Sequence, residues 1–408
     1  LVLSNNLIGE IELEAFRDLW CLDTLYLTLN CLTTIENVLH NLPNLALISL
    51  VGNKIQSISN ETFERNTFLK QIWLSNNDIY NINLYAFRNL IRLEQFLFLE
   101  NRQFMEIGKD LFATNLKLKK VSMLNSKITS IGNRAFSRLR NLLLLDLGAN
   151  YLENLPNEFL PRYTTVGSVF LNSNRLQSIN ATVFANCSIK RLDLSGNQEL
   201  VMNSEALQNS DISLCLNLCF IKEMPNLERL QRLKCLILTL KKPKICLENL
   251  NNLKTLIISQ SNLPNLCDKS CKVSSKVLKK FQITNSHIFE IASDFFISYQ
   301  LLTSLNLSNN FLKQLPKGLL DALVNLNSID LSNNLLETFR FNPFEKNVNL
   351  KSIFIFSNSI TILDRSVLEN LTNLKVLSID FKCQYPTDLI RERKIELVLN
   401  NLNCSLQL

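Results

Sequence analysis

The residue types that most often carry enzyme chemistry are sparse in this chain. Its 408 residues include only two histidines, His40 and His287, which lie far apart in the sequence. No G-x-S-x-G, H-E-x-x-H or Walker-type phosphate-binding sequence occurs. We therefore expect no catalytic residues, no cofactor and no metal site, and we predict that the protein is not an enzyme.

Cysteines are the exception, because the chain contains 11 of them. This content favours an oxidising compartment, in which thiols pair as disulfides. Two C-x-x-x-C pairs, Cys215/Cys219 and Cys267/Cys271, could suggest a zinc site. That spacing is unusual for zinc, however, and His287 is the one histidine nearby. We therefore favour disulfides, and the odd total leaves at least one thiol unpaired or paired with another chain.

Six N-x-S/T sequons agree with an extracellular location and are candidate glycosylation sites. They are Asn60, Asn180, Asn186, Asn306, Asn370 and Asn403. No stretch approaches roughly 18 uncharged apolar residues, so we expect no membrane span in this chain. We predict an extracellular protein, either secreted or the ectodomain of a membrane protein. The first residues, "LVLSNN", begin inside a repeat, and we expect the chain to be an excerpt of a longer protein.

The leucines follow one motif along nearly the whole chain. "LTSLNLSNNFLKQLP" (302–316) and "LNSIDLSNNLLETF" (326–339) both match L-x-x-L-x-L-x-x-N-x-L, one period apart. A fixed period of 20–29 residues with this motif marks a leucine-rich-repeat solenoid. Asparagine fills the key position at Asn6, Asn30, Asn53, Asn77, Asn101, Asn150, Asn174, Asn197, Asn310, Asn334 and Asn358. Other residues fill it at Ser126, Cys219, Lys241, Ser261, Ser286 and Lys382, which makes about 17 repeats.

This motif determines the expected fold. Each x-L-x-L-x segment forms a short strand, and successive strands stack in parallel about 4.8 Å apart. We predict a curved right-handed horseshoe with a concave parallel sheet, α/β by convention but mainly parallel β. Each key asparagine should bond to backbone groups of its own and neighbouring turns. Serine or cysteine is a weaker substitute and lysine is none, so the register is least secure at Lys241 and Lys382.

A second ladder lies about ten residues after each key position. We expect these residues to stack as a buried spine beneath the convex side. They are Phe16, Phe63, Phe87, Phe112, Phe136, Phe159, Phe184, Phe296 and Phe344, with Leu207, Leu320 and Leu368 as variants. Asparagines and phenylalanines are therefore scaffold, and function must be sought elsewhere.

With both ladders, the chain resembles the typical subfamily of extracellular leucine-rich-repeat proteins. "LKQIWLSNNDIYNINLYAFRNL" (69–90) carries the form that this family shares. The family includes Toll and Toll-like receptor ectodomains, Slit-like guidance proteins and related adhesion molecules. The resemblance implies a ligand-binding role in innate immunity, development or cell adhesion.

The pattern divides the chain into four segments. Residues 1–197 and 302–381 are regular repeats, and residues 198–301 are irregular repeats rich in cysteine and lysine. Residues 382–408 resemble a partial C-terminal cysteine cap, without the usual tryptophan and second adjacent cysteine. There we expect a helix capped by Thr387 or Asp388 and running to about Leu399.

Three disulfides are predicted from these placements. Cys383 and Cys404 bracket the C-terminal helix. Cys246 and Cys267 follow consecutive key positions by five and six residues and are the best local pair. Cys215 and Cys235 belong to neighbouring strands and are a second local candidate.

The excess positive charge is concentrated in one segment. Residues 211–285 hold 11 Lys and 2 Arg against 5 Asp and Glu, a net charge of +8, whereas the whole chain carries +7. One interpretation is a solvated lysine surface over a kink in the solenoid. The other is an electropositive patch for an anionic partner, such as a sulfated glycan or an acidic protein surface. No aromatics interleave with the basic residues, so no nucleic acid is expected.

Outward strand positions define the predicted concave face. Large apolar residues there cannot enter the core, and aromatic anchors beside fixed charges are typical of protein-binding patches. The candidate ligand-binding residues are Tyr26, Trp73, Leu97, Leu99, Asp146, Phe170, Asp193, Asp330, Phe354, Phe356 and Asp380.

Two non-enzymatic classes of function remain. The leading one is a receptor ectodomain or secreted recognition protein that binds a protein or glycan through the concave face. The other is a secreted structural, carrier or enzyme-stabilising subunit. Pairing with a second copy or another chain stays open.

Overall fold

Short parallel strands recur once per repeat in the computed structural model, as the alternating leucines require. The structure describes residues 1–202, 205–207, 210–241, 245–247, 249–267, 271–273 and 275–400, without the side chains of residues 37, 245, 246, 271 and 272. The chain divides into two compact units, Leu1–Arg229 and Leu230–Leu408, which are described in turn.

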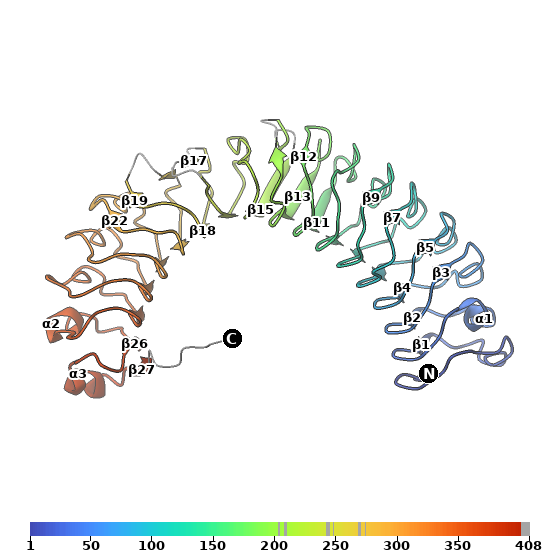
Figure 1. Ribbon diagram of the computed structural model, residues 1–408, viewed down its shortest axis with the longest axis horizontal. Coiled ribbons are helices and arrows are strands. Elements are labelled where there is room, and N and C mark those ends of the chain that lie inside the picture. Colours follow the sequence, from blue (N-terminus) through green and yellow to red (C-terminus); the bar gives the residue numbers. More distant parts are fainter. Residues whose placement is uncertain are drawn as a thin grey trace. The chain divides into compact units, whose positions relative to one another are not determined.

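Unit 1 (Leu1–Arg229) contains one main parallel sheet. Its neighbouring strands follow the chain order: β1 (Thr24–Tyr26), β2 (Leu47–Ser49), β4 (Gln71–Trp73), β6 (Gln95–Leu97), β8 (Lys120–Ser122), β10 (Leu144–Asp146), β11 (Thr165–Phe170), β13 (Ser188–Asp193) and β15 (Asp211–Leu218). Short strands form parallel pairs elsewhere: β3 (Ser57–Ile58) with β5 (Asn81–Ile82), β7 (Glu106–Ile107) with β9 (Ser130–Ile131), and β12 (Ser178–Ile179) with β14 (Val201–Met202). A four-residue helix, α1 (Glu36–Leu39), replaces the outer strand of one turn (Figure 1).

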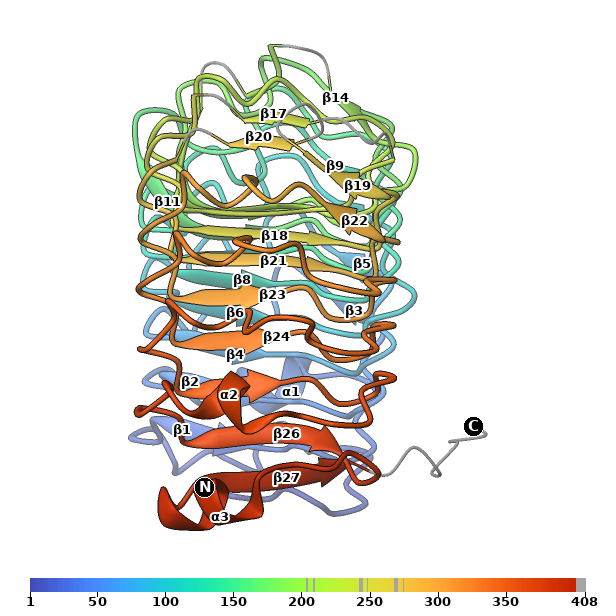
Figure 2. The ribbon, with the colours of Figure 1, turned by 90° about the vertical axis from the view of Figure 1, so that its left-hand side faces the viewer.

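Unit 2 (Leu230–Leu408) repeats this arrangement. Its main sheet contains β16 (Cys235–Leu238), β18 (Thr255–Ser259), β21 (Lys280–Thr284), β23 (Ser304–Asn306), β24 (Ser328–Asp330), β25 (Ser352–Phe354), β26 (Val376–Asp380) and β27 (Glu396–Asn400), all parallel. Smaller pairs are β17 (Ile245–Leu247) with β20 (Cys271–Val273) and β19 (Asn265–Leu266) with β22 (Glu290–Ile291). Two short helices, α2 (Arg365–Leu368) and α3 (Thr387–Glu392), lie near the C-terminal end of the stack (Figure 2).

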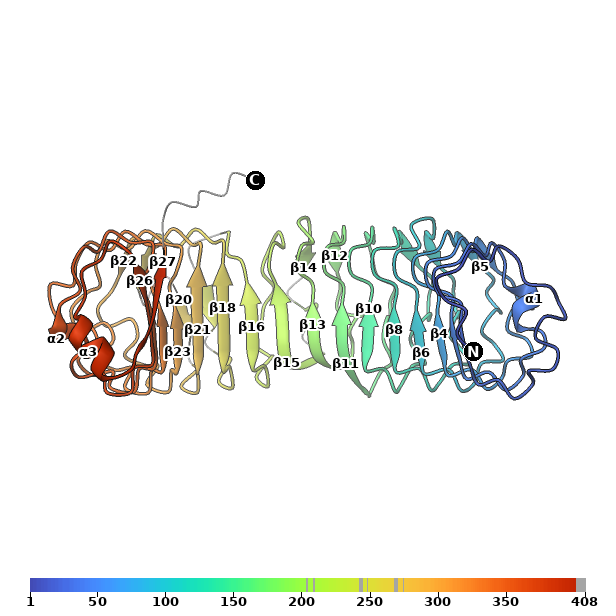
Figure 3. The same cartoon turned by 90° about the horizontal axis from the view of Figure 1, so that it is seen from below.

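Within each unit, the main strands line the inner, concave side of the stack and the short pairs lie on the outer side (Figure 1). Seen from the strand side, the arrows of a unit point the same way (Figure 3). The predicted leucine-rich-repeat solenoid with a concave parallel sheet is confirmed. We call the outward-pointing residues of each main sheet its sheet face.

The asparagine ladder makes the bonds that were expected of it. The Asn150 amide nitrogen donates to the carbonyl of Leu147 at 3.0 Å in its own turn and to that of Met123 at 2.9 Å in the preceding turn. Its oxygen accepts from the backbone N–H of Ser126 at 2.9 Å and of Ile128 at 3.0 Å. Asn150 is buried and bonds to buried backbone groups, of which the Leu147 carbonyl also accepts from the Asn174 amide at 2.9 Å.

The bend itself depends on one residue per turn. Directly before each ladder asparagine, the backbone takes a positive φ, whether the residue is glycine, as at Gly52, or not, as at Leu29 and Ala149. This left-handed conformation costs non-glycine residues roughly 1 kcal/mol, and the ladder bonds on both sides hold it in place.

Three ladder positions were assigned wrongly. The register pairs Asn217 with Asp193, which lies four residues before Asn197, and the positive φ falls at Phe220, so the key position of this turn is the buried Ile221 and not Cys219. The backbone N–H of Leu240 donates to the Ser261 hydroxyl at 2.8 Å, the bond that a key position makes in other serine turns, so the key position is Leu240 and not the exposed Lys241. Lys382 is also exposed. Its expected role belongs to Asp380, whose carboxylate accepts from the backbone N–H of Ser357 at 2.8 Å and of Asn358 at 3.1 Å.

The aromatic spine is confirmed. Phe63, Phe87, Phe112, Phe136, Phe159 and Phe184 are buried, and consecutive rings lie 5.7–6.3 Å apart between centroids. A further set of buried asparagines was not anticipated. Asn66, Asn115 and Asn347 each donate to two carbonyls of the preceding turn, and so join neighbouring turns on the outer side.

The C-terminal segment differs from its prediction. The helix α3 ends at Glu392, and its N-cap position is Pro386, so neither Thr387 nor Asp388 caps it. Residues up to Leu399 do not continue the helix because β27 pairs with β26 over five residues. Tertiary pairing thus overrides the helical start signal in this segment.

Candidate ligand-binding surfaces

An aromatic patch lies on the sheet face of unit 1, and we define it as Tyr26, Trp73, Leu97 and Leu99. Strand register places Tyr26, Ser49, Trp73 and Leu97 side by side in one row. Because Ser49 is small, the Trp73 ring leans across it toward Tyr26, with 6.4 Å between ring centroids and a tilt of 54°. All four patch residues are half-buried, so each keeps part of its side chain accessible.

The indole of Trp73 has a polar group with unsatisfied hydrogen bonding. Its Nε1–H is buried yet finds no hydrogen-bond partner among the described residues. An unpaired buried donor costs roughly 1–3 kcal/mol. This position therefore carries a side chain that is not the best choice for stability.

A second predicted group on unit 1 is brought together by the register. Phe170 lies between Asp146 on one side and Asp193 on the other. Both carboxylates already accept bonds: Asp146 from the N–H of Gly148 at 3.1 Å, and Asp193 from Ser195 and, at 3.0 Å, from the Asn217 amide. Burial raises the pKa of Asp146, and the bonds from Gly148 and Ser122 only partly offset this.

On unit 2, the predicted binding group is Asp330, Phe354, Phe356 and Asp380, and not all of these side chains are accessible to a ligand. Phe354 is beside Asp330 on adjacent strands, and Phe354 and Phe356 are both half-buried. Asp330 accepts from Ser332 and, at 3.2 Å, from the Asn306 amide. Asp380 is buried and holds the turn before it, so its proposed place on the binding surface is wrong.

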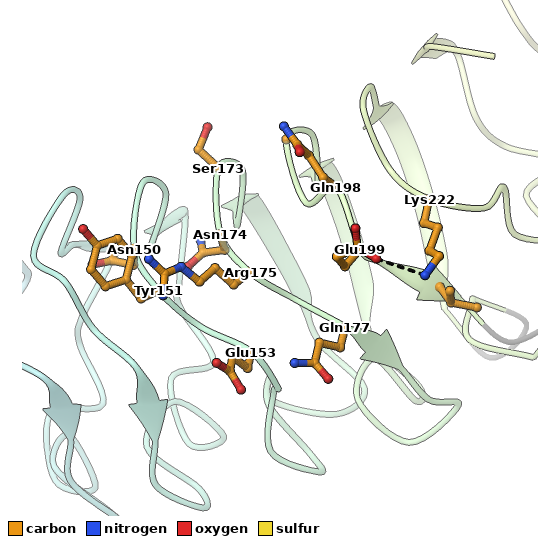
Figure 4. Close-up of a pocket in the computed structure, with 12 residues that line it drawn as sticks. Asn150, Tyr151, Glu153, Ser173, Asn174, Arg175, Gln177, Gln198, Glu199 and Lys222 are labelled. Atoms are coloured by element: carbon orange, nitrogen blue, oxygen red, sulfur yellow. Dashed lines mark hydrogen bonds and ion pairs between the residues drawn. The ribbon is translucent and has the colours of Figure 1, made fainter. Parts of the chain in front are cut away.

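A groove on unit 1 was missed by the sequence reasoning. It has a volume of about 890 Å³ and is lined by the residues that follow three successive ladder positions, with Tyr151, Arg175 and Gln198 among them (Figure 4). The guanidinium of Arg175 stacks 4.0 Å from the centre of the Tyr151 ring. Aligning the residue after each ladder asparagine would have placed these two side by side.

The charges at the far end of the groove compensate one another. Lys222 Nζ lies 3.0 Å from Glu199 Oε2, and this bond raises the pKa of Lys222 (Figure 4). Both side chains are more than half exposed, so the pair adds little stability. The groove is a polar surface with paired charges, and nothing in it suits one charge class of ligand over another.

The described residues test only some of the predicted disulfides. Cys215 and Cys235 are both disulfide-bonded. Cys404 and the side chain of Cys246 lie outside the described residues, so the Cys383–Cys404 and Cys246–Cys267 bridges stay predictions. Cys383 is buried, which raises its thiol pKa to about 11.

The sequons differ in exposure. Asn180, Asn186 and Asn370 are exposed and Asn60 is half-buried, whereas Asn403 lies outside the described residues. Asn306 is on the sheet face, where its amide nitrogen donates to Asp330 and its oxygen accepts from the Ser308 N–H at 2.8 Å. A glycan at Asn306 would replace one hydrogen of the amide nitrogen that bonds to Asp330.

Within the described part of the chain, no cluster of three or more His, Cys, Asp or Glu side chains could hold a metal ion. No helix in the same residues has the length and apolar character needed to cross a membrane.

Comparison with known proteins supports the fold. A leucine-rich-repeat family model matches residues 1–55 and 276–336, and a model of BspA-type leucine-rich-repeat regions matches residues 99–213. A solved leucine-rich-repeat protein of Leptospira interrogans superposes with a TM-score of 0.62 at 20% identity, over 97% of this chain and 94% of the other.

Several curated proteins are similar over shorter stretches. Mouse podocan is 33% identical over 174 residues, 41% of this chain and 27% of podocan. Mouse keratocan is 38% identical over 112 residues, 27% of this chain and 30% of keratocan. Chicken mimecan is 33% identical over 132 residues, 32% of this chain and 43% of mimecan. The chain thus spans less than half the length of each of these relatives.

Fold and surfaces together define a class: a parallel-β solenoid whose regular bends are scaffold and whose strand side presents variable side chains. The chain belongs to the leucine-rich-repeat proteins, as its motif, its strand register and both family models show.

Proposed function

We propose that this protein is a non-enzymatic, extracellular recognition protein that binds a protein ligand through the aromatic patch of unit 1. The observation that carries the proposal is Trp73, whose indole N–H is buried without a partner on the sheet face. Because the scaffold gains nothing from that donor, a role in binding accounts for the ring. Trp and Tyr are the residues most enriched at the energetic centres of protein interfaces.

The composition of the patch favours a protein ligand over a small molecule. Tyr26, Trp73, Leu97 and Leu99 form an open apolar strip along adjacent strands, and an enclosed pocket is what a small ligand usually needs. Polar side chains such as Gln71 and Gln95 border the strip on the same strands. An apolar centre with a polar rim is typical of protein interfaces.

Two features support an extracellular location. Cys215 and Cys235 are disulfide-bonded, which requires an oxidising compartment. Exposed sequons at Asn180, Asn186 and Asn370 are open to glycosylation. The resemblance to Toll-like receptor ectodomains and adhesion proteins suggests immune, developmental or adhesive recognition as the setting.

The test compares two tryptophans. Protein partners captured from extracellular fluid would be purified, and their affinities measured for the wild-type protein, for Trp73→Ala and for Trp20→Ala. Trp20 is 62% exposed and lies outside the patch, so it controls for the loss of a surface indole. We expect Trp73→Ala to weaken binding roughly tenfold or more and Trp20→Ala to change it little.

Folding is checked by the melting temperature of each variant. Trp73→Ala also removes the unpaired donor, which limits its cost in stability. Unchanged affinity in a folded Trp73→Ala variant would refute the proposal for this patch. The paired variant Phe354→Ala/Phe356→Ala examines the corresponding group on unit 2 in the same assay.

A further inference from the structure

Seven residues of unit 2 lie in single file where its main strands begin. The backbone N–H of each donates to the carbonyl of the one before it, at 2.7–2.8 Å. We call them the lysine row: Lys234, Lys254, Lys279, Thr303, Asn327, Lys351 and Lys375. Since neighbours in the row come from adjacent turns of a parallel sheet, their Cα atoms are spaced by about 4.8 Å.

The charges of the row are uncompensated. All five lysines are exposed, and none forms an ion pair within the described part of the chain. Lys280, on the outward side of β21, adds a sixth ammonium next to Lys279. The row ends at Lys375, because Glu396 donates its backbone N–H to the Lys375 carbonyl but is paired in register with Val376. Like charges at this spacing repel one another, and a bound polyanion would relieve the repulsion.

The side chains beside the row are hydroxyls. In the adjoining column of outward positions, Thr255, Lys280, Ser304, Ser328 and Ser352 follow one another on consecutive strands. No carboxylate or aromatic ring occurs among these five residues; the column continues through Val376 and ends at Glu396 on β27. The nearest acid on the same strands, Asp330, is one column further and is already bonded to Asn306 and Ser332.

We infer that the lysine row binds a linear sulfated polysaccharide laid across the strands of unit 2. A straight line of ammonium groups, three before and two after Thr303 and Asn327, matches a linear polymer that carries anionic groups along its length, and the adjoining hydroxyls can bond to sugar hydroxyls. A single-stranded nucleic acid would need aromatic platforms for its bases, and neither column provides one. The site is on the other unit from the aromatic patch, so the two proposals stand or fall separately.

The test measures the binding of a heparin dodecasaccharide to the full chain at two salt concentrations. Lys254→Gln/Lys279→Gln/Lys280→Gln removes three neighbouring charges from the site. Lys313→Gln/Lys317→Gln/Lys382→Gln removes three exposed lysines from unit 2 outside the row and is the matched control. We expect the first variant to bind roughly tenfold more weakly with a smaller salt dependence, and the control to stay within about twofold of wild type.

Two competitors decide between polymer classes. A neutral dextran of similar length should not displace the dodecasaccharide, and a thymidine oligonucleotide of equal charge should displace it only at much higher concentration. Equal losses in both lysine variants would overturn the inference, because binding would then follow net charge alone. Stronger binding of the oligonucleotide, or of poly-glutamate, would overturn it in favour of a nucleic acid or an acidic protein.

Discussion

The same edge of the two units carries opposite kinds of charge pattern. In unit 1, the positions that correspond to the lysine row are Asp23, Ala46, Lys70, Glu94, Lys119 and Leu143, joined by the same backbone bonds. Lys119 Nζ lies 2.7 Å from Glu94 Oε2, and this bond lowers the pKa of Glu94. The row of unit 1 is therefore compensated within itself, whereas that of unit 2 is not.

The difference shows that scaffold and surface vary independently in this fold. Both units rely on buried side chains that bond to the bends, and both keep the same strand spacing. In the described part of the chain, the lysines of the row and the residues of the aromatic patch make no such bonds, so each unit can present its own chemistry. Unit 1 presents apolar rings, and unit 2 presents ammonium groups.

The largest effect is expected in the scaffold that the units share. Asn150→Ala would leave several buried backbone groups of unit 1 unpaired and should cost roughly 2–3 kcal/mol of unfolding free energy. Ser286→Ala in unit 2 removes fewer bonds, since its hydroxyl donates to Thr284 and accepts from Ser261, and should cost about 1 kcal/mol. Urea denaturation midpoints measure both. Equal shifts would mean that asparagine has no advantage over serine in the ladder.

The second-largest effect is expected when the lysine pattern of unit 2 is copied into the corresponding row of unit 1. Glu94→Lys places Lys70, a new lysine and Lys119 in single file and removes the ion pair. We expect this variant to bind the heparin dodecasaccharide about twofold to tenfold more tightly than wild type. Glu94→Gln, which removes the pair without adding a charge in the file, is the control. If both variants bind alike, row geometry is not what the polysaccharide recognises.

The smallest effect concerns a carboxylate of unit 1. Because burial raises the pKa of Asp146, its ionisation destabilises the folded state, and this loss appears as the pH rises through the raised pKa. Asp146→Asn should therefore increase the melting temperature at pH 7 by about 1–2 °C. Near pH 3 the difference should vanish, because Asp146 is then protonated in both states. Asp18→Asn, at an exposed position, should show no such pH dependence.

Much of the fold was predictable because each turn buries the same backbone groups, which need hydrogen-bond partners. Every key asparagine is followed by backbone groups that water cannot reach, so the residue type recurs where the geometry recurs. The prediction was wrong where an unexpected residue occupies the key position, as at Leu240, or bonds to the turn in its place, as at Asp380. Asp380 was taken for an exposed charge because its position in the motif matches the half-buried Phe356, and only the structure shows the amides that it caps.

The binding surfaces were predictable in part. Alternation along the strands correctly placed Tyr26 and Trp73 in one row, but the unpaired indole donor has no signature in the sequence. The positive charge was assigned to residues 211–285 by counting. The lysine row instead crosses that boundary to Lys351 and Lys375, because proximity in a solenoid follows the column of the repeat and not distance along the chain.

Each coil of unit 2 contributes one side chain to the lysine row, so the length of the row depends on the number of coils. Duplication of a single coil would extend the file by one cation without disturbing the bends above or below it. Deletion of a coil would shorten it just as simply. The number of coils thus sets the length of the row. The length of polymer that the row can bind could therefore change between descendants while every coil keeps its form.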